Sequence, residues 1–136
     1  MEFSSEREEI VWRLYNEGWA AGNLDLITEL LDPDVVWTAI EEAPDAGTYR
    51  HHEGVRRYWL DWLGDFDMHP FRINEAIDAG DRLVCTQTGT TTGKRSGVRS
   101  ELNYAAVYRF GEGDRIVEVN EYATRAEALE AVGLQA

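Results

Sequence analysis

The chain has 136 residues, of which 43% are hydrophobic and 11% aromatic, and its formal net charge at pH 7 is −13. This size and composition exclude a disordered chain and predict one domain over residues 1–136 with a substantial core. The negative charge repels phosphate backbones and anionic membranes, so we expect no nucleic acid and no membrane among its partners. The single cysteine, Cys85, excludes an intrachain disulfide, and with no apolar run of membrane-spanning length this favours a cytoplasmic protein.

The first half of the sequence predicts helices and a single strand. Ser5 and Glu8 have the spacing of a capping box, which marks the start of a helix. Apolar residues then recur at helical spacing up to the pair Gly22-Asn23. The expected elements are a helix from residue 5 to 22, a second over 24–31 that Pro33 ends, a strand over 34–40, a turn-rich loop over 43–50 and a helix over 53–65.

Beyond Pro70 the apolar period changes to two, which indicates strands. Thr124 and Glu127 form a second capping box, so a short helix should end the chain. Short turns between strands require antiparallel neighbours, and helices grouped before a sheet indicate the α+β class. A strongly twisted sheet packed on helices can form an open cone. The four strands are expected over residues 71–79, 83–93, 98–110 and 115–123.

The last strand places a carboxylate in its apolar row. Val117 and Val119 alternate with Glu118 and Asn120, so Glu121 falls on the valine side. A carboxylate that faces a core loses solvation, which raises its pKa above the usual value of about 4.3 and suits it to proton transfer near neutral pH. The alternatives are a structural group that accepts a hydrogen bond from a tyrosine or an indole, or a group at the exposed strand end.

Two further positions are weaker candidates. Glu75 falls in the apolar row that begins at Phe71, although a charge on an edge strand also serves to discourage association. His51 and His52 lack the additional ligands that a metal site needs, so we expect no metal and no cofactor. His52 is expected to cap the helix beginning at Glu53, or else to lie at a pocket mouth as an acid–base partner.

Large aromatic side chains can form a core or line an apolar ligand site. We expect Trp19, Trp37 and Trp59 as pocket walls. Cys85 and Gln87 share one side of their strand, and we expect both at the ligand pocket. Cys85 should be a buried small hydrophobe there, because no neighbouring group activates its thiol. Gln87 offers an amide to the pocket or is a polar group of the sheet surface. The aromatic set comprises Trp19, Trp37, Tyr58, Trp59 and Trp62.

The outer face of the predicted sheet is also apolar. Asn120 and Tyr122 point away from the valine row, and Ala105 and Val107 share their side. Because such a face is too apolar for solvent alone, we expect a homodimer through it.

Four stretches carry a resemblance to the SnoaL-like branch, small bacterial proteins of the nuclear transport factor 2-like superfamily: NEGWAAGNLDLITELLDPDVVW, PDAGTYRHHEGVRRYW, AIDAGDRLV and RIVEVNEYATRAEALEAVGL. The resemblance covers nearly the whole chain. It implies a mixed, mainly antiparallel sheet wrapped around N-terminal helices as a cone with an internal pocket, the cystatin-like roll, and it makes the face of Glu121 the concave one. Relatives include ketosteroid isomerases, polyketide cyclases, epoxide hydrolases and dehydratases, so the fold does not select a reaction.

Two groups of relatives can be compared residue by residue. The catalytic tyrosine of ketosteroid isomerases corresponds to Tyr15, but their base corresponds to Ala39 and their protonated aspartate to Ala106, which excludes that mechanism. Polyketide cyclases carry an acid–base residue in a last-strand stretch such as IVEHWD. In the corresponding IVEVNE this acid is Glu121, while Val119 replaces the histidine and an asparagine the tryptophan.

Three functions follow as expectations. The first is a cofactor-free acid–base enzyme of cyclase, isomerase or hydrolase type that acts on a small apolar metabolite. Glu121 would move a proton, and Tyr15, supported by Tyr104 as a second donor, would polarise a carbonyl or position water. The second is a non-catalytic binding protein for an apolar ligand. The third is a dimerisation scaffold whose own aromatic side chains fill the cone.

Overall fold

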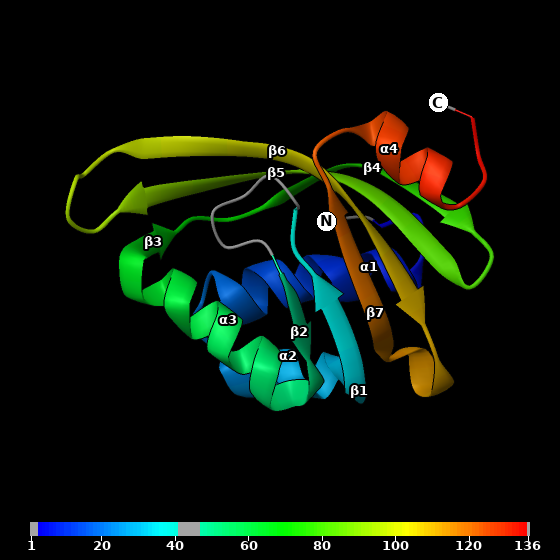
Figure 1. The fold of residues 1–136 in the computed structure, drawn as a ribbon, viewed down its shortest axis with the longest axis horizontal. Coiled ribbons are helices and arrows are strands. Elements are labelled where there is room, and N and C mark those ends of the chain that lie inside the picture. The colour runs from blue at the N-terminus through cyan, green and yellow to red at the C-terminus, as the bar shows by residue number, and fades with distance from the viewer. Residues whose placement is uncertain (1–2, 41–46, 136) are drawn as a thin grey trace.

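The computed structural model describes residues 3–40 and 47–135. The chain forms a curved sheet whose faces are covered by helices (Figure 1). The helical elements are α1 (Glu6–Arg13), η1 (Leu14–Trp19), α2 (Leu24–Leu30), α3 (His51–Asp65), η2 (Glu112–Asp114) and α4 (Arg125–Ala131). The strands are β1 (Leu31–Thr38), β2 (Thr48–Arg50), β3 (Phe66–Met68), β4 (Arg72–Ala79), β5 (Arg82–Gly93), β6 (Arg99–Phe110) and β7 (Ile116–Tyr122).

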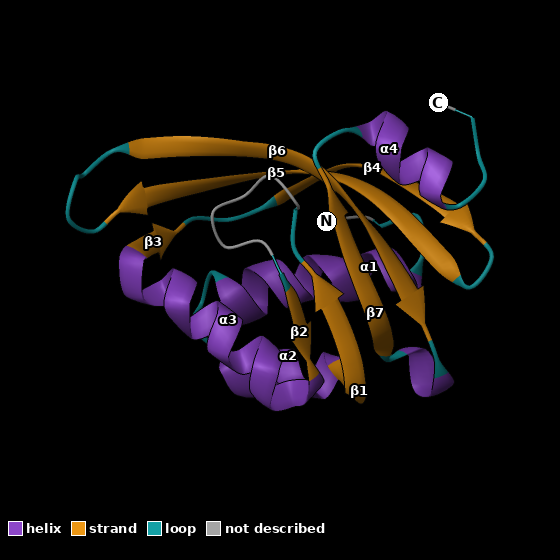
Figure 2. Ribbon diagram, viewed as in Figure 1, coloured by secondary structure: helices purple, strands orange, loops and turns teal. Residues whose placement is uncertain are grey.

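The sheet has the order β2-β1-β7-β6-β5-β3, with β4 also paired to β5. The β1–β7 pair is parallel and the other strand pairs are antiparallel. Figure 2 shows the strands arching over the three N-terminal helices, with α4 on the opposite face of the sheet. The fold is therefore α+β, a strongly curved mixed sheet wrapped around helices, as the sequence predicts. Its main core lies between the concave face and α1 to α3.

The first helix changes geometry where it meets the core. Ser5 caps α1 by accepting a hydrogen bond from the Glu8 backbone N–H at 3.2 Å. From Leu14 the helix widens to a π-helix, in which the Ala20 N–H donates to the Tyr15 carbonyl at 2.8 Å. Such π segments are rare and often found at functional sites, and this one carries both Tyr15 and Trp19.

Two boundaries differ from the prediction. Strand β1 begins at Leu31, so Pro33 lies inside it rather than ending a helix, a position that proline tolerates near the first residues of a strand. Helix α3 begins at His51, directly after β2. His52 is therefore in the first turn and does not cap the helix; its Nε2 donates to the Leu31 carbonyl at 2.8 Å. Of the loop predicted over 43–50, residues 43–46 lie outside the described residues.

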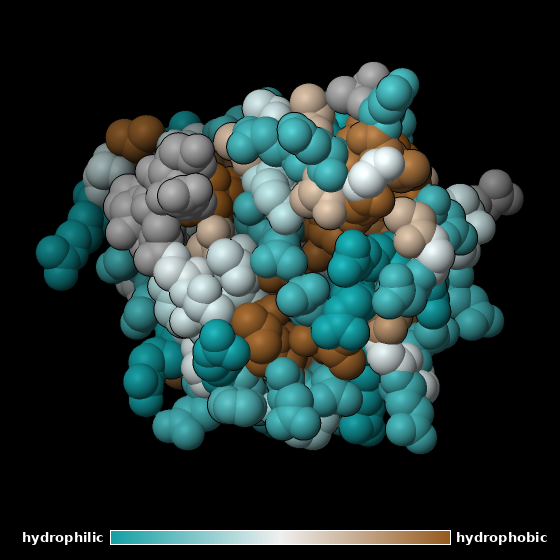
Figure 3. Space-filling model, turned by 45° about the vertical axis from the view of Figure 1, so that its right-hand side comes forward, coloured by the Kyte–Doolittle hydropathy of each residue, from teal (hydrophilic) through white to brown (hydrophobic). Residues whose placement is uncertain are grey.

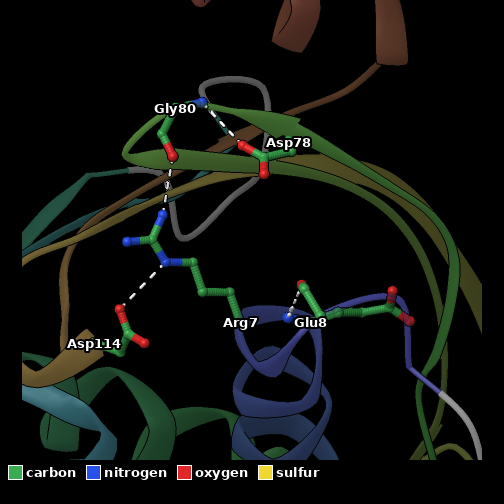
Figure 4. Close-up of polar contacts among 6 residues, drawn as sticks. Arg7, Glu8, Asp78, Gly80 and Asp114 are labelled. Atoms are coloured by element: carbon green, nitrogen blue, oxygen red, sulfur yellow. Dashed lines mark hydrogen bonds and ion pairs between the residues drawn. The ribbon is translucent and has the colours of Figure 1, made fainter.

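Arg7 joins α1 to two connections of the sheet. Its Nη1 donates to the Gly80 carbonyl at 2.9 Å in the β4–β5 turn, and its Nε lies 3.3 Å from Asp114 Oδ1 after β6 (Figure 4). The guanidinium also lies 5.0 Å from the ring centroid of Phe110. One side chain of the first helix thus holds together two turns that are distant in sequence.

A β-bulge in β4 corrects the prediction for Glu75. The register with β5 shifts between Ile73 and Glu75, because a bulge adds one residue to one strand and reverses the faces beyond it. Ile73 accordingly packs on the main core, whereas Ile77 packs in a second cluster on the outer face. Glu75 binds Arg125 of α4 through two hydrogen bonds of 2.7 and 3.3 Å. Glu75 therefore links β4 to α4 and does not face the concave side of the sheet.

This ion pair gives a pH-dependent contribution to stability. The hydrogen bond from Arg125 is the main reason that the pKa of Glu75 lies below its ordinary value. A lowered folded-state pKa stabilises the fold above the unfolded pKa, and that stabilisation is lost as pH falls through the folded pKa. We expect Glu75→Gln to lower the free energy of unfolding slightly at neutral pH, since both groups are partly exposed, and not at acidic pH. Urea unfolding at both pH values measures this, and an equal loss at both would contradict it.

Helix α4 covers the apolar outer face on which we based the expected homodimer. Val84, Ala105 and Val107 of the sheet pack against Ala128 and Leu129 of α4, and all five side chains are buried. Apolar side chains at the surface form patches divided by polar ones on the side shown in Figure 3. The chain itself therefore accounts for the apolar character of this face, and the homodimer stays a prediction.

Candidate functional site

A cavity of about 360 Å³ lies between the helices and the concave face of the sheet. Its volume is in the range of small-molecule sites, which are mostly apolar with a few polar groups. Aromatic rings from η1 and α3 form much of its wall, residues of β6 and β7 form most of the rest, and Ile40 and Phe71 lie between elements. The described residues that line it are Trp19, Ile40, Tyr58, Trp62, Phe71, Glu101, Leu102, Asn103, Tyr104 and Glu121.

Glu121 is the carboxylate on the inner wall of this cavity. In the β6–β7 register it lies opposite Ala106, and it shares its face with Val119, which is fully buried in the main core. The indole Nε1 of Trp37, a fully buried residue of β1, donates to Glu121 Oε2 at 3.1 Å. The alternation of the last strand therefore places the carboxylate inward, and a neutral donor orients it against the cavity.

Tyr15 lies behind the cavity rather than on its surface. Its side chain is only 1% exposed, and its ring stacks on Phe71 with centroids 4.9 Å apart. Its hydroxyl is hydrogen-bonded to that of Tyr108 at 2.7 Å. Phe71 thus lies between the core and the cavity, and Tyr15 supports it from the core side.

Three tyrosines and Gln87 are arranged in a ring, three sides of which are hydrogen bonds. Gln87 Nε2 donates to the Tyr104 hydroxyl at 3.1 Å, and Gln87 Oε1 accepts from the Tyr108 hydroxyl. Because a hydroxyl has one proton and an amide oxygen only accepts, Tyr108 donates to Gln87 and must accept from Tyr15. The three bonds run in one direction, from Tyr15 to Tyr104, and such networks strengthen each bond.

The environment keeps these tyrosines neutral. Burial is the largest cause of the raised pKa of Tyr15, Tyr104 and Tyr108, and the nearby tyrosines add to it. A negative charge on Glu121 raises all three pKa values further. The three hydroxyls therefore act as hydrogen-bonding groups and not as bases at physiological pH.

The structure brings part of the predicted site together. Trp19, Tyr104 and Glu121 line the cavity, while Tyr15 and Gln87 support it through the hydrogen bonds of the ring. The other predicted wall residues, Trp37, Trp59, Cys85 and His52, are absent from its lining.

Each of these four residues has another place. Trp37 and Trp59 are core residues, and the Trp59 N–H has no hydrogen-bond partner within the described residues. Cys85 is buried, which raises the pKa of its thiol and leaves it unreactive. The imidazole of His52 binds the Leu31 carbonyl, so nothing places it at the pocket mouth.

Several cavity residues were not predicted as lining. Tyr58 and Trp62 are four residues apart on α3 and so share a helix face, and this spacing could have paired them ahead of Trp59. Phe71 directly follows Pro70, and its role depends on contacts with Tyr15. Ile40, Glu101, Leu102 and Asn103 have no local sequence signal, since only the curvature of the sheet brings them to the cavity.

The described residues form neither a cluster of metal ligands nor a helix able to span a membrane. Within residues 3–40 and 47–135, no three potential metal-ligating side chains converge. None of the helices in that described part combines the length and the apolar character of a membrane-spanning segment.

The profile of the SnoaL-like domain family matches residues 12–119, which is most of the chain. The chain belongs to this family. Its members share the cone described above, and the matched region contains most of the cavity wall but ends two residues before Glu121. No curated protein sequence matches this SnoaL-like chain significantly.

Solved structures share the SnoaL-like fold at low sequence identity. One, from Catenulispora acidiphila, is described as having a ketosteroid isomerase-like fold in complex with trimethylamine; it is 19% identical, covers 93% of both chains and gives a TM-score of 0.72. A protein of unknown function from Burkholderia pseudomallei is 25% identical over 94% of this chain and 98% of that one, with a TM-score of 0.72. A nuclear transport factor 2-like protein from Burkholderia thailandensis is 25% identical over 83% of this chain and 86% of that one, with a TM-score of 0.69.

Proposed function

We propose that this SnoaL-like protein binds a small molecule with an apolar body in the cavity, and that Glu121 exchanges a proton with it. The observation that carries the proposal is the position of Glu121: one oriented carboxylate on the inner wall of an otherwise largely aromatic cavity. A carboxylate held beside a bound molecule can act as a general base on a carbon or oxygen acid of that molecule.

The cavity also bears on the scaffold hypothesis. A cone filled by its own side chains would leave no such space, whereas about 360 Å³ is available beside Glu121. The family includes isomerases and cyclases, and both classes need a proton donor or acceptor beside a bound substrate. In our proposal Tyr104 takes over the polar contact that we had expected of Tyr15, because Tyr104 lines the cavity and Tyr15 does not.

One observation favours a second candidate, binding without chemistry. Tyr15 lies behind the cavity and its proton is directed to Tyr108, so its hydroxyl is not set up to donate to a substrate carbonyl. A protein that only sequesters its ligand needs no such donor.

Proton exchange on a probe ketone separates the two functions. In D₂O, we expect the protein to accelerate exchange of the α-protons of 2-tetralone: Glu121 takes the proton from carbon, and the enolate then takes deuterium from a deuterated carboxyl or from solvent. Glu121→Gln should remove about a hundredfold of this acceleration, the usual contribution of a general base. Proton NMR of the ketone measures the rate directly.

A matched control is available on the same strand. Glu118→Gln changes the net charge equally, but Glu118 is ion-paired to Arg109 and is absent from the cavity lining. It should leave the exchange rate unchanged. Exchange at the buffer rate in the parent protein, with the ketone still bound, would overturn the catalytic function in favour of binding alone. No binding of the ketone or of any apolar probe would overturn both.

A further inference from the structure

We propose that the cavity selects an organic cation: a ligand whose apolar body carries an ammonium group. This inference rests on the proposed function, because it takes the cavity to be the ligand site, and it adds the charge of the ligand. It is carried by two properties of the cavity wall, namely the density of aromatic rings and the sign of its charged groups.

Five aromatic rings line the cavity, and two of them meet at a right angle. The rings of Trp19 and Trp62 have centroids 5.6 Å apart and an interplanar angle of 84°, and Phe71 lies 5.1 Å from Trp19. The face of an aromatic ring is electron-rich and attracts a cation within about 6 Å. The aromatic cages that bind alkylated ammonium groups likewise combine several rings around one small space. The five rings are those of Trp19, Tyr58, Trp62, Phe71 and Tyr104.

The charged groups of the wall all have the same sign. Glu121 and Glu101 line the cavity, and none of the described lining residues is basic. The hydrogen bond from Trp37 to Glu121 comes from a neutral indole, so it orients the carboxylate without cancelling its charge. The net charge of −13 adds a long-range field that attracts cations and repels anions.

These groups share one small space. The two carboxylates and the ring faces present negative potential on several sides of one cavity of about 360 Å³, which complements an ammonium N–H or a polarised N–CH₃ group.

A pair of probes of equal shape tests the charge alone. In (3-hydroxyphenyl)trimethylammonium and 3-tert-butylphenol, a quaternary nitrogen replaces a quaternary carbon. We expect the cation to bind at least about tenfold more tightly, as measured by calorimetry and by shifts of the indole N–H signals. Added salt should weaken binding of the cation and not of the phenol.

Variants show whether the wall is responsible. Glu121→Gln should remove most of the preference for the cation and leave the affinity for 3-tert-butylphenol within about twofold, while Glu118→Gln should change neither. Equal binding of both probes, or tighter binding of the phenol, would overturn the cation inference and leave the proposed function standing. Failure of both probes to bind would overturn the inference and the proposed function together.

Discussion

Gln87→Glu is expected to make the stability of the fold strongly dependent on pH. Gln87 is 1% exposed, and its amide both donates to Tyr104 and accepts from Tyr108. A protonated carboxyl can replace both hydrogen bonds, because its O–H donates and its other oxygen accepts. An ionised carboxyl cannot donate to Tyr104, and it would be buried close to the negative charge of Glu121.

The expected size of the effect follows from the pKa of the introduced carboxyl. Burial raises such a pKa by about 3 units, and each unit corresponds to about 1.4 kcal/mol. An acid whose pKa is raised in the folded state keeps its proton there after the unfolded chain has lost it. Stability is therefore retained below the unfolded value of about 4.3 and falls as pH rises toward the folded value. The variant should lose about 4 kcal/mol between about pH 4 and pH 8 relative to the parent.

Urea unfolding at several pH values measures this loss, and Gln87→Leu is its control. Leucine has nearly the same volume and cannot ionise, so its cost, that of losing the hydrogen bonds of Gln87, should be the same at every pH. If the loss for Gln87→Glu is also the same at every pH, position 87 is hydrated. That result would contradict the burial of Gln87 between Tyr104 and Tyr108.

Gly89→Ala is expected to disturb both the core and the cavity. A Cβ at this position of β5 would lie 2.4 and 2.5 Å from two ring atoms of Phe71, well inside van der Waals contact. Phe71 cannot retreat easily, because it stacks on Tyr15 and packs beside Trp19. Overpacking of this kind costs about 1–3 kcal/mol. The Phe71 ring can then move only into the cavity, where it would take up space for a ligand. The affinity for 3-tert-butylphenol should therefore fall as well.

Two further variants assign the effect to this contact. Gly64→Ala in α3 meets no atom within 4 Å, and alanine favours helices over glycine, so its stability should be equal or higher. In the double variant with Phe71→Leu, the smaller side chain leaves room for the methyl group, and the combined loss should be smaller than the sum of the single losses. Additive losses would show that Gly89 and Phe71 do not constrain each other.

Local patterns determined most of the elements. The two capping boxes begin helices at the expected residues, with Ser5 and Thr124 as the capping side chains. The change of period after Pro70 predicts the long strands, and the alternation from Val117 to Glu121 places the carboxylate on the inner face. These signals depend on neighbours along the chain, so a single sequence contains them.

Interruptions of a pattern could not be predicted in the same way. The alternation of β4 assigns Glu75 to the face of Ile73, but a bulge between them sends it to the outer face, where it binds Arg125. The apolar outer face, on which the homodimer prediction rests, packs against α4 of the same chain, a contact that the alternation of the strands does not show; the homodimer itself stays a prediction. In both cases the deciding partner is distant in sequence, and periodicity carries no information about it.

The sequence by itself therefore determined the class of fold and the inward carboxylate at Glu121. The tertiary structure decided which aromatic residues form the cavity wall and which lie behind it, because periodicity tells which way a side chain points but not how deep it lies. It also decided that Tyr15 is joined to Tyr108, and Tyr108 to Gln87, by hydrogen bonds. These groups come from η1, β6 and β5, and they meet only because the sheet curves over the first helix.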